Sequence, residues 1–134
     1  MYLLDTDVLS LLRRPDRNPA VARWLDGVAD RDLWLSAVTI GEIARGIALQ
    51  RPRDADFAAE LEAWFAVLRR DYASRVLPFG PAEAALWGEL SARLGHASAD
   101  LMIAATAMAR GLTVVTRNLR HYEPTGAAVL DPGA

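Results

Sequence analysis

The sequence predicts an α/β fold in which helices cover both faces of a parallel sheet. Short apolar runs recur along the chain, and the longer stretches between them show the apolar spacing of amphipathic helices. Strands that alternate with helices pair in parallel, because each helix returns the chain to the same end of the sheet. The expected strands are Tyr2–Leu4, 33–35, Val76–Leu77, 112–115 and 127–130.

Residues that favour helix ends mark the segments between these strands. Asn18 and Ser98 can each cap a helix, and Pro81 suits a first helical turn. Gly95 and Gly111 suit the position just after a last turn. Helices are therefore expected over 8–13, from Asn18 past Leu25, over 39–50, 54–71 and Pro81–Leu94, and from Ser98 to Gly111.

The composition of the 134-residue chain excludes several kinds of chemistry. There is no cysteine, so disulfides, thiolate nucleophiles and zinc–thiolate centres are excluded. All 15 basic residues are arginine, which excludes mechanisms that need a lysine. The formal net charge of −2 lacks the basic excess of most nucleic-acid binders. Neither a signal peptide nor a membrane-spanning run is visible, so we expect one soluble, cytoplasmic domain over 1–134.

Polar residues follow three of the expected strands, at the edge where parallel α/β sheets bind their ligands. These are Asp5-Thr6-Asp7, then Ser36, then Thr116-Arg117-Asn118. Each segment also has a plainer interpretation. Asp5 could be a turn residue, and Asn118 a turn residue or a helix cap. We favour Asp7 as the cap of a helix that begins at Val8.

Two acidic residues lie on expected helices. Asp100 begins a helix that is apolar on all sides and therefore buried, so its carboxylate needs a partner, a metal ion or the positive end of the helix. Glu42 lies away from the apolar stripe of its helix, which favours an exposed side chain paired with Arg45, although a cleft-facing glutamate would show the same pattern. His96 and His121 are isolated, and surface or capping roles are expected for both.

Four segments of the chain form a recognisable set. They read L-L-D-T-D-V-L-S, V-T-I-G-E-I-A-R-G-I, A-D-L-M-I-A-A-T-A and G-L-T-V-V-T-R-N-L-R-H-Y. Together they resemble a PIN domain, in the branch of the VapC toxins, along nearly the whole chain. The resemblance implies a three-layer α/β/α sandwich with a central parallel sheet. It also implies an endoribonuclease whose catalytic residues are Asp5, Glu42 and Asp100, with Asn118 at the fourth position and hydroxyl support from Thr6 and Thr116.

The same resemblance implies a cofactor and partners. Asp5 and Asp100 would bind Mg²⁺ or Mn²⁺ directly, while Glu42 and Asn118 hold its waters for attack on an RNA phosphodiester. Such a nuclease would be the toxin of a type II toxin–antitoxin pair, blocked by a VapB-like antitoxin, and would form a homodimer. Phosphates beside the cut could be contacted by Arg117, Arg45 or Arg13-Arg14, and the sequence does not choose among them.

The chain departs from the family pattern at three positions, and two other functions stay open. Asn118 stands where aspartate is frequent, which weakens any second metal site; His121 stands where an acid is frequent; and Asp7, often asparagine in relatives, is left out of the predicted set. One alternative is a catalytically weak PIN-like module that binds RNA or a partner. The other is a phosphatase of the haloacid-dehalogenase type, which the D-x-D motif allows but the missing lysine disfavours.

Overall fold

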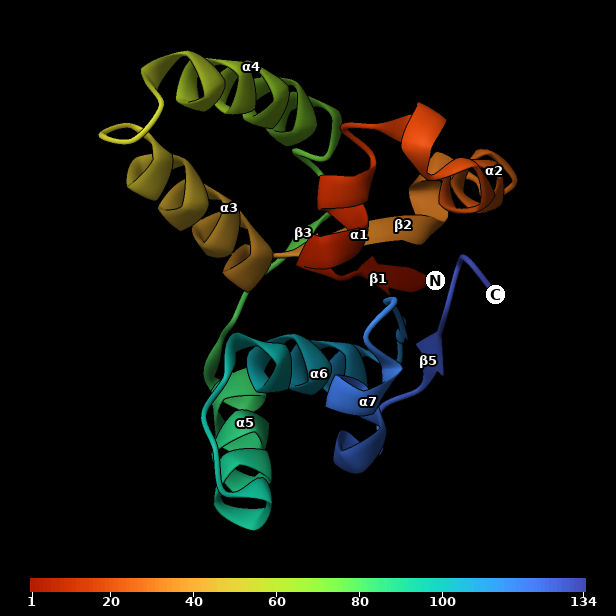
Figure 1. The fold of residues 1–134 in the computed structure, drawn as a ribbon. Coiled ribbons are helices and arrows are strands. Elements are labelled where there is room, and N and C mark those ends of the chain that lie inside the picture. Colours follow the sequence, from red (N-terminus) through yellow and green to blue (C-terminus); the bar gives the residue numbers. More distant parts are fainter.

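A five-stranded parallel sheet forms the centre of the computed structural model, which describes residues 1–134. Every strand pair is parallel, and the strands lie in the order β3-β2-β1-β4-β5 (Figure 1). The predicted parallel α/β sheet is therefore confirmed. The strands are β1 (Tyr2–Leu4), β2 (Leu33–Ser36), β3 (Val76–Leu77), β4 (Thr113–Val115) and β5 (Val129–Leu130).

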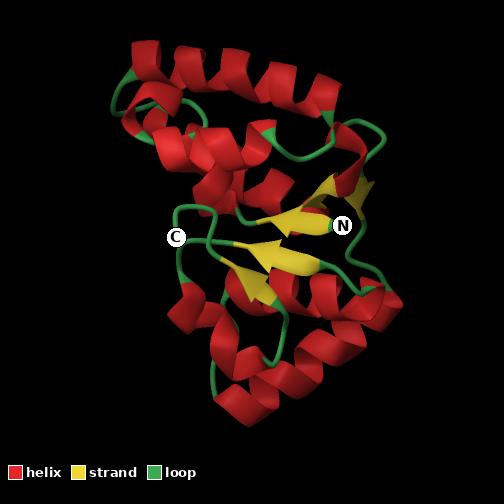
Figure 2. Cartoon of the chain, turned by 90° about the vertical axis from the view of Figure 1, so that its right-hand side faces the viewer, coloured by secondary structure: helices red, strands yellow, loops and turns green.

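Helices cover both faces of the sheet, which makes three layers (Figure 2). One face carries α1 (Thr6–Leu11), α2 (Pro19–Asp26), α3 (Ala37–Gln50) and α4 (Ala55–Asp71). The other carries α5 (Pro81–Leu94), α6 (Ala99–Arg110) and α7 (Leu119–Tyr122). Short 3₁₀ segments occur at Pro15–Arg17, Asp30–Asp32 and Glu123–Thr125.

Each face of the sheet has its own hydrophobic core, because neighbouring residues of a strand point to opposite faces. Leu4 and Val115 lie in the core beneath α1 to α4, whereas Leu3 and Val114 lie in the core beneath α6 and α7. All four side chains are fully buried. The two central strands are therefore apolar on both sides, which fixes the position of the loops that follow them.

Pro81, Gly95 and Gly111 occupy the helix-end positions that the sequence predicts. Asp54 caps α4 by accepting a hydrogen bond from the backbone N–H of Phe57. Gly95 and Gly111 follow α5 and α6 with φ angles of 78° and 70°, a left-handed conformation that glycine adopts without strain. None of the helices combines the length and apolar character needed to cross a membrane.

None of the three predicted side-chain caps forms its capping hydrogen bond. Helix α1 begins at Thr6, two residues earlier than expected, and its N-cap residue is Asp5 rather than Asp7. The side chain of Asp5 accepts a hydrogen bond from the N–H of Thr6. The Asn18 side chain does not cap α2; its amide donates to the carbonyl oxygens of Leu11 and Arg14 and ties the end of α1 to the loop. Ser98 occupies the N-cap position of α6 but makes no side-chain hydrogen bond there.

Candidate active site

Asp5 is the most firmly held residue at the carboxyl edge of the sheet. It directly follows β1 and is only 4% exposed. Its Oδ1 accepts a hydrogen bond from the N–H of Thr6 at 2.8 Å, and its Oδ2 accepts one from the hydroxyl of Thr116 at 2.9 Å. Because Thr116 directly follows the neighbouring strand β4, the sheet itself sets the orientation of this carboxylate.

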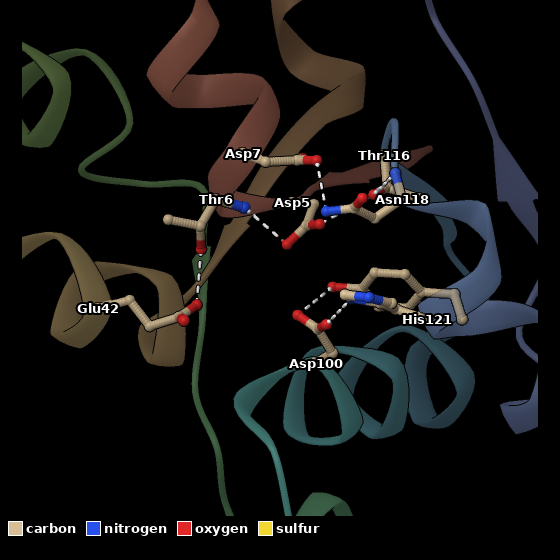
Figure 3. A network of polar contacts seen from close by, with 9 residues as sticks. Asp5, Thr6, Asp7, Glu42, Asp100, Thr116, Asn118 and His121 are labelled. Atoms are coloured by element: carbon tan, nitrogen blue, oxygen red, sulfur yellow. Dashed lines mark hydrogen bonds and ion pairs between the residues drawn. The ribbon is translucent and has the colours of Figure 1, made fainter.

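Glu42 faces the site from α3. The Thr6 hydroxyl lies 2.7 Å from Glu42 Oε1 and 3.1 Å from the hydroxyl of the buried Thr39 (Figure 3). The expected ion pair with Arg45 does not form, and the Glu42 side chain is half-buried rather than solvent-facing. The preferred reading of Glu42 as a surface residue is therefore wrong, because the side of α3 opposite its apolar stripe packs toward α1.

Asp100 lies across the site from Glu42, in the first turn of α6 (Figure 3). Its side chain is 26% exposed. Oδ2 lies 2.8 Å from Nδ1 of His121, and Oδ1 accepts a hydrogen bond from the hydroxyl of Tyr122 at 3.3 Å. An ionised carboxylate can only accept, so the imidazole donates from Nδ1. Both partners come from the short helix α7.

Tyr122 connects the two aspartates. Its side chain is fully buried, and burial together with the charges of Asp5 and Asp100 raises the pKa of the phenol well above its usual value. The hydroxyl therefore remains a donor. It donates to Asp100 and lies close enough to Asp5 to lower the pKa of that carboxyl. Tyr122 was not among the residues predicted from the sequence, because a single tyrosine in a four-residue helix shows no pattern that indicates a functional role.

Burial and neighbouring negative charges raise the pKa of Asp5 and of Glu42. For Asp5, desolvation raises the pKa most, the charge of Asp100 adds to it, and hydrogen bonds from Tyr122 and Thr116 oppose it. For Glu42, desolvation again raises the pKa most, and the charges of Asp5 and Asp100 contribute. The negative charges of Asp5 and Asp100 therefore act on neighbouring carboxyls of the site, and a cation between them would relieve this repulsion.

Asp7 and Asn118 form a pair beside Asp5. The Asn118 amide donates to Asp7 Oδ2 at 3.3 Å, and the backbone N–H of Asn118 donates to the Thr116 hydroxyl at 3.0 Å. Asp7 Oδ1 is buried without a hydrogen-bond partner. Burial and the charge of Asp5 raise the pKa of Asp7 to about 7. Asp7 therefore belongs with Asp5, Glu42 and Asp100 to one carboxylate cluster, although the set of residues predicted from the sequence omitted it.

The donor set fits a hard divalent cation that keeps part of its water shell. Carboxylate oxygens are the ligands that Mg²⁺ and Mn²⁺ prefer, and the free oxygen of Asp7 adds to them. No three acidic or histidine side chains lie close enough together to surround one ion directly. Mg²⁺ usually takes one or two carboxylates and several waters, so two carboxylates suffice for such an ion.

All four predicted catalytic residues lie in this network. Asp5, Glu42, Asp100 and Asn118 come from four separate stretches of chain and meet at the carboxyl edge of the sheet (Figure 3). The predicted hydroxyl support from Thr6 and Thr116 is present as hydrogen bonds to Glu42 and Asp5. Their catalytic and metal-binding roles stay predictions.

An α/β/α sandwich with a carboxylate cluster at the carboxyl edge of its parallel sheet defines a class that includes metal-dependent nucleases. Residues 2–126 match the PIN domain family. The chain belongs to this family, which confirms the resemblance drawn from the sequence.

Relatives of similar length are named as a toxin, a plasmid stability protein and a VapC ribonuclease. The chain is 37% identical to Toxin FitB of Neisseria gonorrhoeae, with 98% of both chains covered. It is 36% identical to Plasmid stability protein StbB of Pseudomonas syringae pv. tomato, again over 98% of both. It is 34% identical to VapC ribonuclease Y4jK of Sinorhizobium fredii, over 98% of this chain and 97% of the other.

Solved structures confirm the fold. The crystal structure of FitAcB from Neisseria gonorrhoeae matches with a TM-score of 0.87 and 35% identity, over 98% of both chains. FitAB bound to a DNA fragment matches with a TM-score of 0.84 and 33% identity, over 100% of this chain and 96% of the other. VapBC2 from Rickettsia felis, at 17% identity and a TM-score of 0.75, supports the fold alone.

Proposed function

We propose that this chain is an endoribonuclease that uses Mg²⁺ or Mn²⁺ and acts as the toxin of a toxin–antitoxin pair. The observation that carries the proposal is the meeting of Asp5 and Asp100 around the hydroxyl of Tyr122. Relatives named as VapC ribonucleases and toxins support the choice of RNA as substrate.

Asp5 and Asp100 hold the cation in this proposal. When bound, it supplies positive charge that neutralises the phosphate oxygens and makes a water molecule more acidic. Asp5 is held by Thr6 and Thr116, and Asp100 by His121 and Tyr122, so both carboxylates are oriented before any ligand arrives. Such orientation by neighbouring hydrogen bonds favours metal binding.

Glu42 takes the proton of the attacking water. Oε1 is occupied by the Thr6 hydroxyl, which leaves Oε2 free to accept that proton. Burial raises the pKa of Glu42 and makes it a stronger base than an exposed glutamate. The water oxygen attacks phosphorus, the bond to the leaving ribose oxygen breaks, and that oxygen takes up a proton from solvent water. Asn118 orients water without adding negative charge, so a second cation binds more weakly.

An antitoxin of the VapB type is the proposed partner. Solved structures similar to this chain include FitAcB and FitAB, and one curated relative is named Toxin FitB. Such a partner would cover the carboxylate cluster and keep RNA out. The homodimer implied by the family resemblance stays a prediction.

Metal removal and two substitutions test the proposal. RNA cleavage should be lost in EDTA and return with Mg²⁺ or Mn²⁺. Asp5→Asn and Asp100→Asn should each abolish it, whereas Asp26→Asn should not, because Asp26 is exposed at the end of α2 and makes no ion pair. Cleavage that survives in both site variants would reject the assignment.

A binding module with little catalysis is the second candidate. It is favoured by Asn118 in place of an acid and by the lack of three converging metal ligands. Calorimetric titration with Mn²⁺ separates the two cases. A nuclease site should bind Mn²⁺ in the wild type and lose it in Asp100→Asn, whereas a binding module should show no site-specific uptake.

A further inference from the structure

A polar pocket lies beside Asp100, next to the carboxylate cluster. Its volume is about 360 Å³, and five of its six lining residues carry polar side chains. Asp100 and its partner His121 form the wall shared with the cluster. The complete lining is His96, Ser98, Asp100, Arg120, His121 and Pro124.

The pocket contains a positive charge that has no partner in the protein. Arg120 is exposed and forms neither an ion pair nor a side-chain hydrogen bond, whereas Arg110 is bound to Glu83. His96 and the Ser98 hydroxyl also make no side-chain hydrogen bond. These three potential donors are therefore free to contact a ligand from outside the chain.

The first turn of α6 adds further donors. This helix has 12 residues, and Ser98 at its N-cap position leaves the turn without a side-chain cap. The backbone N–H groups of Ala99 and Asp100 have no protein acceptor, and residues 98 and 100 both line the pocket. Free N–H groups and the helix dipole together favour an anion at this place.

We propose that this pocket binds a backbone phosphate of the RNA strand, immediately next to the phosphodiester that is cut. The inference rests on the proposed nuclease function. A strand that crosses a cluster of carboxylates needs cationic contacts beside it, and the chain as a whole is acidic, with a net charge of −2. Arginine, serine and helix N-termini are typical phosphate contacts.

The other pocket at the site suits a phosphate less well. It lies between α1, α3 and α4 and is lined in part by Phe57, Leu61 and Trp64. Its arginine, Arg13, stacks on the Phe57 ring with the guanidinium carbon 5.3 Å from the ring centroid. An apolar wall of this kind suits bases or a protein side chain, so the phosphate is assigned to the Asp100 side.

Steady-state cleavage of a short RNA tests the assignment. Arg120→Ala should raise KM about tenfold and leave kcat nearly unchanged, since one charge-assisted contact is lost away from the reacting atoms. The dependence of log(kcat/KM) on log salt should become shallower by about 0.7. The KM of Arg120→Lys should fall between those of the wild type and Arg120→Ala. Arg31→Ala is the matched control, an exposed arginine before β2 with no ion pair, and should resemble the wild type.

A modified substrate identifies the phosphate itself. RNAs with a neutral methylphosphonate at single positions beside the cut are compared in wild type and Arg120→Ala. At one position, the methylphosphonate should weaken cleavage by the wild type but cause no further loss in Arg120→Ala. Ser98→Ala should weaken RNA cleavage at the same position without loss of stability, because its hydroxyl caps nothing.

Three outcomes have distinct meanings. If wild type cleaves but Arg120→Ala matches Arg31→Ala, the pocket is not a phosphate site and the inference is overturned. If Arg120→Ala weakens only antitoxin binding, the pocket binds an acidic antitoxin side chain, and the inference is again overturned. If wild type cleaves no RNA with Mn²⁺, the proposed function itself fails, and the RNA subsite fails with it.

Discussion

His121 Nδ1 lies 2.8 Å from Oδ2 of Asp100, and this contact fixes the orientation of a carboxylate on another helix. Because α7 is only four residues long, its position depends on what it contacts rather than on its own hydrogen bonds. The contact joins α6 to α7. A positioning role for His121 follows, and it can be tested apart from stability.

His121→Ala should raise the Mn²⁺ concentration needed for half-maximal cleavage about 10- to 100-fold, because Asp100 loses the donor that orients it. His121→Asn can still donate from its amide and should recover much of the loss. The measurement is RNA cleavage against Mn²⁺ concentration. Equal metal dependence in wild type and His121→Ala would remove His121 from the site.

Tyr122→Phe should shift the acid limb of the pH–rate profile to higher pH. The Tyr122 hydroxyl lowers the pKa of Asp5, so its removal raises that pKa further and leaves less carboxylate to bind a cation at low pH. Global stability should change by only about 1 kcal/mol, the usual size of one hydrogen bond. An acid limb at the wild-type pH in a folded variant would contradict this role.

Asp7→Asn should stabilise the metal-free protein above pH 7. Burial and Asp5 raise the pKa of Asp7 to about 7, from an ordinary value of 3.8. The folded state therefore prefers the protonated carboxyl, and wild type loses stability as pH rises from about 4 to 7. After a discount for partial exposure, the gain at pH 8 is about 1–2 kcal/mol.

Urea unfolding in EDTA at pH 4 and pH 8 measures this effect. The two proteins should be equally stable at pH 4, where Asp7 is protonated in the folded protein. Asp16→Asn, at an exposed position in a 3₁₀ segment, should show no such dependence. A less stable Asp7→Asn protein at pH 8 would show that the carboxylate has a stabilising partner.

Glu83→Gln should lower the melting temperature at pH 7 but much less below pH 4. Hydrogen bonds from backbone N–H groups at the start of α5, and from Arg110, lower the pKa of Glu83. A carboxyl group whose pKa is lowered by folding stabilises the folded state at pH values above its unfolded-state pKa. This stabilisation is lost as the pH falls through its folded-state pKa. Thermal unfolding across pH checks this, and a difference independent of pH would refute it.

The regular elements could be predicted from the sequence because apolar spacing reports them directly. The strand Tyr2–Leu4 and the helix Pro81–Leu94 have the predicted bounds, and α3 and α4 differ only at their first residues. The four-residue helix α7 and the three-residue 3₁₀ turns could not be predicted, since helical segments this short show no period.

The direction in which each side chain of the site points was harder to predict than which residues belong to the site. The family resemblance identified Glu42, but periodicity alone placed it in solvent, because a side that faces a cleft and a side that faces water show the same polar pattern. Asp7 was expected to cap α1, whereas the cap is Asp5, two residues earlier. The contact between His121 and Asp100 depends on how α6 and α7 pack, which local sequence does not report.

A crystal structure of the protein soaked with Mn²⁺ tests the central claim most directly, because Mn²⁺ can be located by its anomalous scattering. If Asp5 and Asp100 are the metal ligands, one strong peak should lie about 2 Å from a carboxyl oxygen of each, with waters completing the shell. No peak between these two residues at saturating Mn²⁺, or a peak bound only elsewhere, would contradict it.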